Sequence, residues 1–191
     1  MSAQPQPRWT AEEYLAHERQ TETKSEFLDG EVFAMAGASR EHNLISLNVA
    51  VALHPQLAAR GCEEYVNDMR VLIPATGLYT YPDIVAACGE PQFSDDERDT
   101  LVNPVLVAEV LSPSTADYDR GRRFAYYRSL ASLQIYLLIA SDEVHLERFV
   151  RQPSGEWLLT EFTDLEAVVE LPDLGARLPL AAIYRRVPGL G

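Results

Sequence analysis

The sequence predicts a mixed α/β fold in which helices flank one central mixed β-sheet. Three observations predict this fold class. The chain opens with a capped helical pattern, a hairpin pattern and a second helical pattern, continues with three short apolar runs typical of strands, and then has a helix followed by two further strand-like runs. Elements in this order are typical of a sheet covered by helices.

The length of 191 residues fits one domain with a sizeable hydrophobic core, and hydrophobic residues make up 47% of the chain. We expect a flexible polar lead at residues 1–8 and a single domain over residues 9–188. The sequence contains no internal repeat and no low-complexity segment.

The first elements have clear end signals. Residues 9–18 predict a helix, with Thr10 as N-cap and Glu13 three positions later in a capping-box pattern. The stretch "SEFLDGEVFAMAG" then predicts two short strands joined by a turn at Asp29 and Gly30, a dipeptide typical of hairpins.

A longer helix is predicted from Ser39. Leu44, Leu47 and Val51 recur at spacings of three and four residues, which is the period of a buried helix face. Pro55 is expected to kink or end this helix, because proline lacks the amide hydrogen that a helix interior needs.

The remaining elements follow as alternating patterns. We expect strands at 63–74, 81–88, 104–111, 134–140 and 143–151, a helix at 118–130, and a hairpin turn around 153–155. Residues 89–103, "GEPQFSDDERDTLVN", are expected to form a mobile, exposed acidic loop.

Composition limits the function classes. The net charge of −13 counts against a nucleic-acid partner without excluding it, because such proteins usually carry a basic surface. Binding of DNA would then require a local basic patch or bridging metal ions. The chain has no secretory signal and no apolar run near the ~18 residues of a membrane span. Cys62 and Cys88 lie in separate segments without a CxxC pairing, so we expect reduced thiols and a cytoplasmic protein.

Two acids interrupt segments that otherwise resemble buried strands. Asp83 follows Pro82 at the start of an apolar run, and Glu109 lies inside "PVLVAEVL". A buried carboxylate is costly, and two on neighbouring strands repel each other. Mg²⁺ or Mn²⁺ would remove both problems, since hard cations prefer oxygen ligands. The pair is therefore a candidate metal site; the alternative is that each acid caps or salt-bridges a neighbour.

The segment "DYDRGRRFAYYRS" is the one locally basic patch of the chain. On a helix Arg120, Arg123 and Tyr127 share a face, which would bind a phosphate if it overlooked the carboxylates. The alternative is a solvated, salt-bridged helix face.

The four histidines show no zinc-binding spacing. His42 near the start of the second helix is a candidate metal ligand or water-activating base, with surface exposure as the alternative.

Further acids near the second helix are candidates for completing a metal site, and spacing alone does not rank them. They are Glu26, Asp29, Glu31 and Glu41.

With these residues identified, the chain resembles the Uma-two family of bacterial proteins, within the restriction-endonuclease-like superfamily named for its PD-(D/E)xK motif. The resemblance covers nearly the whole chain. It is carried by "FLDGEVFAMAGAS", by His42, by "YPDIVAACG", by "NPVLVAEVLSPSTADYDRGRRFAYYRSLASLQIYLLI" and by "LPDLG". The stretch "EVLSPST" followed by "YDRG" is its most specific mark.

The resemblance implies a restriction-endonuclease-like core and Mg²⁺-dependent hydrolysis of DNA phosphodiesters. It assigns Asp83 and Glu109 to the metal, with the backbone carbonyl of Val110. The superfamily's early helix often carries a further glutamate, and here His42 or Glu41 is nearest that position, with Glu31 as an alternative. The superfamily lysine would fall at Leu111, and in this family it appears instead at the position of Arg123. Arginine keeps the charge and binds phosphate but does not act as a base.

The sequence therefore leaves three functions open. The first is a Mg²⁺- or Mn²⁺-dependent endonuclease with Asp83, Glu109, Arg123 and His42 in its site. The second is a catalytically inactive nuclease-fold protein for binding or assembly, which the net charge and the arginine favour. The third is a metal-dependent hydrolase of small phosphoesters. A homodimer is expected from the exposed strands near the termini, and no membrane partner is expected.

Overall fold

The computed structural model of the chain describes residues 8–112 and 116–191. Most of the predicted lead (residues 1–8) and part of the "EVLSPST" motif (residues 113–115) lie outside them. The described residues contain no helix long and apolar enough to cross a membrane. The helical elements are α1 (Ala11–Glu18), α2 (Arg40–Ala58), α3 (Ala116–Tyr118), the π-helical turn η1 (Asp119–Arg123), α4 (Phe124–Tyr127), the 3₁₀ turn η2 (Pro172–Leu174) and α5 (Leu180–Ile183).

The strands form two larger sheets and one hairpin. The strands are β1 (Ser25–Leu28), β2 (Glu31–Ala34), β3 (Cys62–Val66), β4 (Arg70–Ile73), β5 (Leu78–Thr80), β6 (Ile84–Cys88), β7 (Thr100–Leu101), β8 (Leu106–Leu111), β9 (Ile135–Ala140), β10 (Leu146–Arg151), β11 (Trp157–Phe162), β12 (Val168–Leu171) and β13 (Ala176–Pro179).

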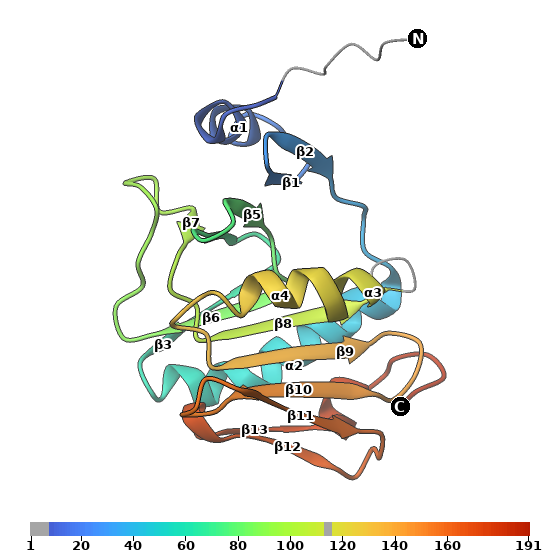
Figure 1. Cartoon of the computed structure of the whole chain (residues 1–191). Coiled ribbons are helices and arrows are strands. Elements are labelled where there is room, and N and C mark those ends of the chain that lie inside the picture. The colour runs from blue at the N-terminus through green and yellow to red at the C-terminus, as the bar shows by residue number, and fades with distance from the viewer. Residues whose placement is uncertain (1–7, 113–115) are drawn as a thin grey trace.

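The six-stranded sheet is the core of the fold, and its order is β11-β10-β9-β8-β6-β3. Only β8 and β9 run parallel in it, and the segment that joins them contains η1 and α4. Figure 1 shows α4 over one face of this sheet and α2 behind the other. This mixed sheet flanked by helices confirms the predicted fold class.

Alternation along β8 divides the core into two apolar clusters. Leu106, Ala108 and Val110 pack toward α2, whereas Val107 and Leu111 pack toward α4. Side chains on a strand point to opposite faces in turn, so Glu109 emerges on the α4 side.

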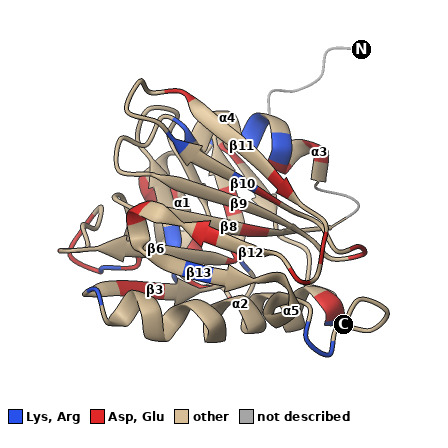
Figure 2. Ribbon diagram, turned by 90° about the horizontal axis from the view of Figure 1, so that it is seen from below, with Lys and Arg blue, Asp and Glu red and all other residues tan. Residues whose placement is uncertain are grey.

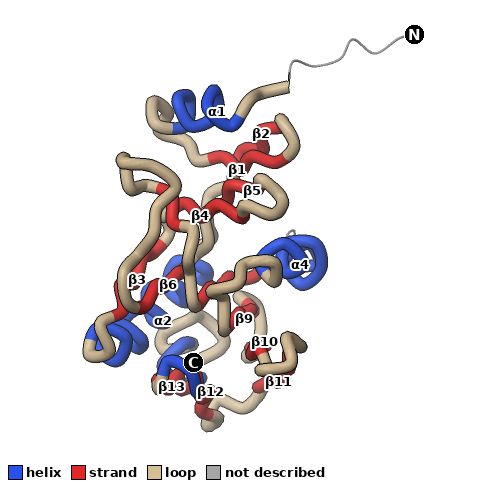
Figure 3. Tube along the Cα trace, turned by 60° about the vertical axis from the view of Figure 1, so that its left-hand side comes forward, coloured by secondary structure: helices blue, strands red, loops and turns tan. Residues whose placement is uncertain are grey.

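The five-stranded sheet, β2-β1-β5-β4-β7, forms with α1 a second layer above the core. Figure 3 shows this layer stacked on the six-stranded sheet. The chain passes between the two sheets from β3 to β4 and from β5 to β6. The capping box of Thr10 and Glu13 is present in α1, and Asp29 and Gly30 have the positive φ angles of a tight hairpin turn. Both local predictions are confirmed.

Helix α2 does not end at Pro55, which was one of the two predicted outcomes, but continues through it to Ala58. Its buried face follows Ile45, Val49, Leu53 and Leu57 at spacings of four, while Leu47 and Val51 are exposed. The face predicted from Leu47 and Val51 was wrong, because the chain offers two apolar stripes here and only packing selects between them.

The acidic segment 89–103 is ordered, in contrast to the predicted mobile loop. Arg19 of α1 binds Asp99 with its Nε at 2.7 Å and Asp95 with an Nη2 at 2.7 Å. The hydrogen bond from Arg19 is the main cause that lowers the pKa of the Asp99 carboxyl to about 2. Strand β7 within the segment pairs with β4.

Cys62 and Cys88 form a disulfide, which corrects the expectation of reduced thiols. They are 26 residues apart in sequence, but β3 and β6 are antiparallel and their register sets Cys62 opposite Cys88. The cytoplasmic location therefore loses its argument from cysteine usage and stays a prediction.

Removal of this disulfide is expected to lower the free energy of unfolding by about 3.5 kcal/mol, the loop-closure value for a ring of this length. Urea unfolding of the oxidised protein and of a Cys62→Ser, Cys88→Ser double variant measures the difference. Dithiothreitol should destabilise only the wild type. Two titratable thiols in the denatured, non-reduced wild type would contradict the bond.

Candidate active site between the two sheets

A cavity of about 1080 Å³ lies where the five-stranded sheet faces the core. Its walls include the strands β1 and β2, the segment that leads into α2, the ends of β6 and β8, the turn η1, and the segments at residues 23–24, 67–68 and 78–81. Residues more than 80 positions apart therefore share one hollow, as Glu26 and Glu109 do.

The structure brings Asp83 and Glu109 together in this cavity. Strands β6 and β8 are antiparallel with Ile84 opposite Ala108, so Asp83 falls beside Glu109 at one end of the pair. The Asp83 amide lies 3.4 Å from Glu109 Oε2, and the Val110 amide donates to Asp83 Oδ2 at 2.7 Å. The two carboxylates are thus fixed by the pairing of their own strands.

His42 lies at the same carboxylate. Its Nε2 is 2.7 Å from Asp83 Oδ1, and its side chain is 16% exposed. Ser39 caps the helix by accepting from the His42 amide at 3.1 Å, which fixes the first turn of α2 at the cavity. The predicted alternative of simple surface exposure for His42 is therefore wrong.

Glu109 is buried, at 3% exposure, and has two partners from the helical segment. The Tyr127 hydroxyl donates to Glu109 Oε1 at 2.9 Å, and Arg123 Nη1 lies 3.5 Å from the same oxygen. Burial raises the pKa of Glu109 well above its ordinary value; Arg123 opposes this shift and the charge of Asp83 adds to it. Glu109 is therefore a carboxylate whose charge needs a cation nearby.

Arg123 is a largely buried cation of the site, with a side chain that is 11% exposed. Its Nη2 donates to Glu26 Oε1 at 2.6 Å, and its Nε lies 3.2 Å from Asp119 Oδ1. Together with Glu109, these carboxylates raise the pKa of Arg123 against the opposing effect of burial. Arg123 belongs to η1, and π-helical turns are frequent at functional sites. Leu111, at the usual lysine position, is 3% exposed.

Glu26 lines the cavity, whereas the predicted ligand Glu31 does not. Glu31 is exposed on β2, and Glu26 on β1 is 8% exposed and accepts a hydrogen bond from the Thr80 hydroxyl. The sequence had left both among four unranked acids. No local signal in "SEFLDGE" distinguishes Glu26 from Glu31, because Glu26 is buried only where β1 packs over the core.

The basic segment is mostly engaged within the protein. Arg120 binds Glu147 at 2.5 Å, and Arg128 lies over the Phe124 ring at 5.2 Å. Arg122 is exposed and lines the cavity. Figure 2 shows this basic stretch at α3 and α4 in a ribbon on which Asp and Glu recur widely.

One family model and two relatives match most of the chain. A family model described as "Putative restriction endonuclease", Uma2, matches residues 11–181. The chain belongs to the Uma2 family. A relative from Synechocystis sp., the "Uncharacterized protein sll1609", is 40% identical over 161 residues, which cover 84% of this chain and 91% of the relative. A second, slr1290 of the same organism, is 35% identical over 183 residues, covering 95% and 94%.

A solved structure shares the fold of this Uma2 protein. It is the crystal structure of "a putative nuclease belonging to DUF820" from Anabaena variabilis, with a TM-score of 0.67. The match covers 91% of this chain and 96% of that one at 19% identity. The likeness shows that the two proteins share a fold.

The Uma2 site offers carboxylate oxygens, which are the ligands that a hard divalent cation prefers. Asp83 and Glu109 offer carboxylate oxygens in one cavity, and Glu26 and Asp119, which both pair with Arg123, add negative charge. Among the described residues no three His, Cys, Asp or Glu side chains are grouped closely enough to hold a metal ion. An ion here would therefore rely on the carboxylate pair, water and substrate oxygens, as Mg²⁺ commonly does.

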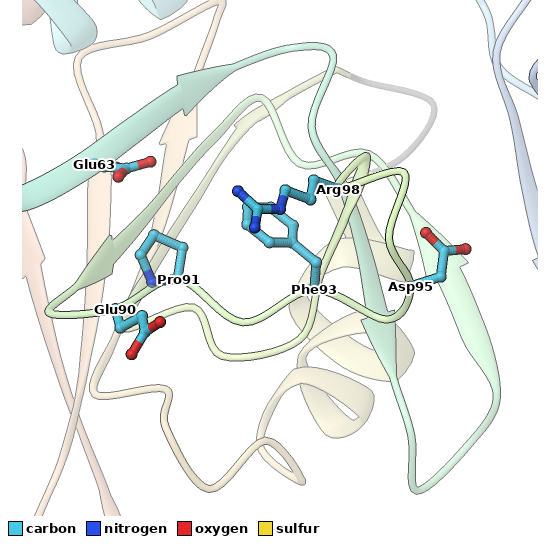
Figure 4. A pocket seen from close by; sticks show the side chains of 6 residues that line it. All are labelled: Glu63, Glu90, Pro91, Phe93, Asp95 and Arg98. Atoms are coloured by element: carbon cyan, nitrogen blue, oxygen red, sulfur yellow. The ribbon is translucent and has the colours of Figure 1, made fainter.

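A second hollow of about 510 Å³ lies away from this site in the Uma2 protein. Figure 4 shows the side chains that line it, from β3 and from residues 90–98: Glu63, Glu90, Pro91, Phe93, Asp95 and Arg98. Three of them are acidic, and Asp95 already binds Arg19. No residue that lines the first cavity also lines this hollow.

Proposed function

We propose that this protein is a Mg²⁺- or Mn²⁺-dependent nuclease that hydrolyses DNA phosphodiester bonds. The observation that carries the proposal is the pairing of Asp83 and Glu109 across β6 and β8 in one cavity, each fixed by hydrogen bonds. The family description and the nuclease named in the Anabaena structure support it.

The metal would be held by Asp83 and Glu109, with the Val110 carbonyl as a further oxygen. When bound, Mg²⁺ or Mn²⁺ supplies a coordinated water of lowered pKa and neutralises charge on a phosphate. The side chains around the pair have positioning roles. His42 Nε2 at 2.7 Å and the Val110 amide hold the two oxygens of Asp83, while Tyr127 and Arg123 hold Oε1 of Glu109.

Arg123 gives the second candidate function its support. This residue stands where family resemblance implies a lysine, and three carboxylates bind its guanidinium. An arginine held in this way does not accept a proton. A nuclease-fold protein that binds or assembles without turnover would have such a site, and the net charge of −13 also favours it.

Cleavage assays with wild type and Arg123→Lys decide between the two. Supercoiled plasmid and single-stranded DNA are incubated with Mg²⁺, Mn²⁺ or EDTA. Nicking that requires the metal is expected from the wild type, and faster nicking is expected from Arg123→Lys, because lysine restores a titratable amine at this position.

Absence of cleavage by both proteins would contradict the nuclease proposal and favour the binding or assembly protein. Inhibition of DNA cleavage by a short nucleotide that is itself hydrolysed faster would instead identify a small phosphoester as the substrate. Arg123→Lys keeps the positive charge at this position, so a change in cleavage rate cannot be attributed to loss of that charge.

A further inference from the structure

Lys24 is the single lysine of the chain, and it lies in the wall of the cavity. It precedes β1, in the segment between α1 and the five-stranded sheet. The other 15 basic residues of the 16 are arginines. No role for this lysine follows from the carboxylate pair or from the family motif.

The ammonium of Lys24 is tied to the wall that holds Asp83. Its Nζ donates to the Asn67 carbonyl at 2.9 Å and to Asp68 Oδ1 at 3.1 Å. The Asn67 amide in turn donates to the Asp83 carbonyl at 2.9 Å. Nζ also lies 5.6 Å from the centre of the Tyr81 ring, two residues before Asp83. One short turn therefore links Lys24 to the backbone of Asp83.

The ammonium of Lys24 can still donate a hydrogen bond to a ligand. An ammonium has three N–H donors, and two of them have acceptors within the described part of the chain. Its side chain is 38% exposed, and that of its ion-pair partner Asp68 is 87% exposed. An exposed ion pair of this kind contributes little stability, so a stronger anion displaces Asp68 at small cost.

The other cations of the site are less free. Arg123 is 11% exposed and bound by three carboxylates, and Leu111 leaves the usual lysine position uncharged. Arg122 is exposed on the opposite element, η1. On the Asp83 side of the cavity, Lys24 is thus the cation among the described residues that an entering phosphate would meet.

We propose that Lys24 binds a non-bridging phosphate oxygen of the nucleic-acid strand that enters the cavity. Lys24 is then a substrate-binding residue, and Asp68 is the anion that holds its ammonium until the phosphate takes its place. This inference rests on the proposed nuclease function and adds the contact that positions the strand beside Asp83.

The salt dependence of DNA binding tests whether Lys24 contacts a phosphate. An eight-nucleotide labelled single strand is titrated with protein in Ca²⁺, and anisotropy is followed at several salt concentrations. Lys24→Met is expected to weaken binding about 10-fold and to lower the salt slope by about 0.7, the value for one phosphate contact with a single strand. Asp68→Asn should tighten binding, and Lys24→Arg should keep most of it.

Arg185→Met is the matched control, because Arg185 is exposed and does not line the cavity. It also removes one positive charge and should leave both affinity and salt slope unchanged. In cleavage assays Lys24→Met should raise KM more than it lowers kcat, as expected for a group that binds the substrate.

A direct readout is available because the chain has one lysine. Protein labelled with ¹³C-lysine gives a single side-chain Cε signal, whose shift is followed during titration with the oligonucleotide, a mononucleotide and inorganic phosphate. A saturating shift with the oligonucleotide, at the concentration where anisotropy changes, supports the proposal. Equal saturation by inorganic phosphate at the same concentration would overturn the assignment to a nucleic-acid strand.

The two proposals fail separately. If the oligonucleotide binds and wild type cleaves DNA while the Lys24 signal and the Lys24→Met affinity do not change, the inference is overturned and the nuclease stands. If no nucleic acid binds and none is cleaved, both are overturned.

Discussion

An Asp83→Asn variant is expected to bind Mn²⁺ about 10- to 100-fold more weakly than wild type and to lose at least about 100-fold in the rate of metal-dependent nicking. The physical reason is the loss of one of the two carboxylates that share the cavity. Asparagine keeps the size of the side chain and one oxygen that accepts from the Val110 amide, which lies at 2.7 Å. The fold should therefore be retained.

Calorimetric titration of Mn²⁺ and a plasmid nicking assay measure the two effects, with urea unfolding as the check on the fold. Glu31→Gln is the informative control, because sequence reasoning named Glu31 as a ligand and the structure places it exposed and outside the cavity lining. It should bind Mn²⁺ and cleave like wild type. Identical Mn²⁺ binding by wild type and Asp83→Asn would show that the metal site lies elsewhere.

The contrast between Glu31 and Glu26 shows which parts of the site a sequence can predict. Asp83 and Glu109 interrupt apolar strands, and this local anomaly is visible in the sequence. Glu26 is separated from Glu109 by 83 positions, and it reaches the site only because β1 packs over the core. No periodicity within "SEFLDGE" encodes that approach, so the choice between these acids needed the folded chain.

The same division holds for the fold. The capping box at Thr10 and the hairpin at Asp29 depend on a few adjacent residues, and both were predicted. The disulfide of Cys62 and Cys88 and the ordering of the acidic segment by Arg19 depend on contacts between distant segments. The missing CxxC pairing suggested reduced thiols and the acidic, polar sequence suggested a mobile loop, because local sequence does not show partners that are remote.

Arg123→Met is expected to lower the free energy of unfolding by about 3–5 kcal/mol at pH 8, the usual cost of removing one partner from a buried ion cluster. The guanidinium is 11% exposed, and it lies 2.6 Å from Glu26, 3.2 Å from Asp119 and 3.5 Å from Glu109. Without it these buried carboxylates lose their cation. Arg128→Met, on the same helical segment but exposed, should cost about 1 kcal/mol or less.

The loss should depend on pH with a definite sign. Burial already raises the pKa of Glu109 in the folded protein, and removal of Arg123, which opposes this shift, raises it further. A carboxyl with a raised folded pKa costs stability above its unfolded pKa of ~4.3, and the cost falls as the pH drops toward that value. Urea unfolding should therefore show a large difference between wild type and Arg123→Met at pH 8 and a smaller one at pH 5.

A second substitution separates charge from packing at Arg123. If the loss comes from uncompensated carboxylates, Glu26→Gln added to Arg123→Met should recover part of the stability, although Glu26→Gln alone removes a 2.6 Å ion pair and destabilises the wild type. If the loss comes from a cavity left by the arginine side chain, the second substitution should only add to it, and the difference between variants should be the same at pH 5 and pH 8. The sign of this coupling thus decides whether Arg123 acts in the folded site as the resident cation among its acids.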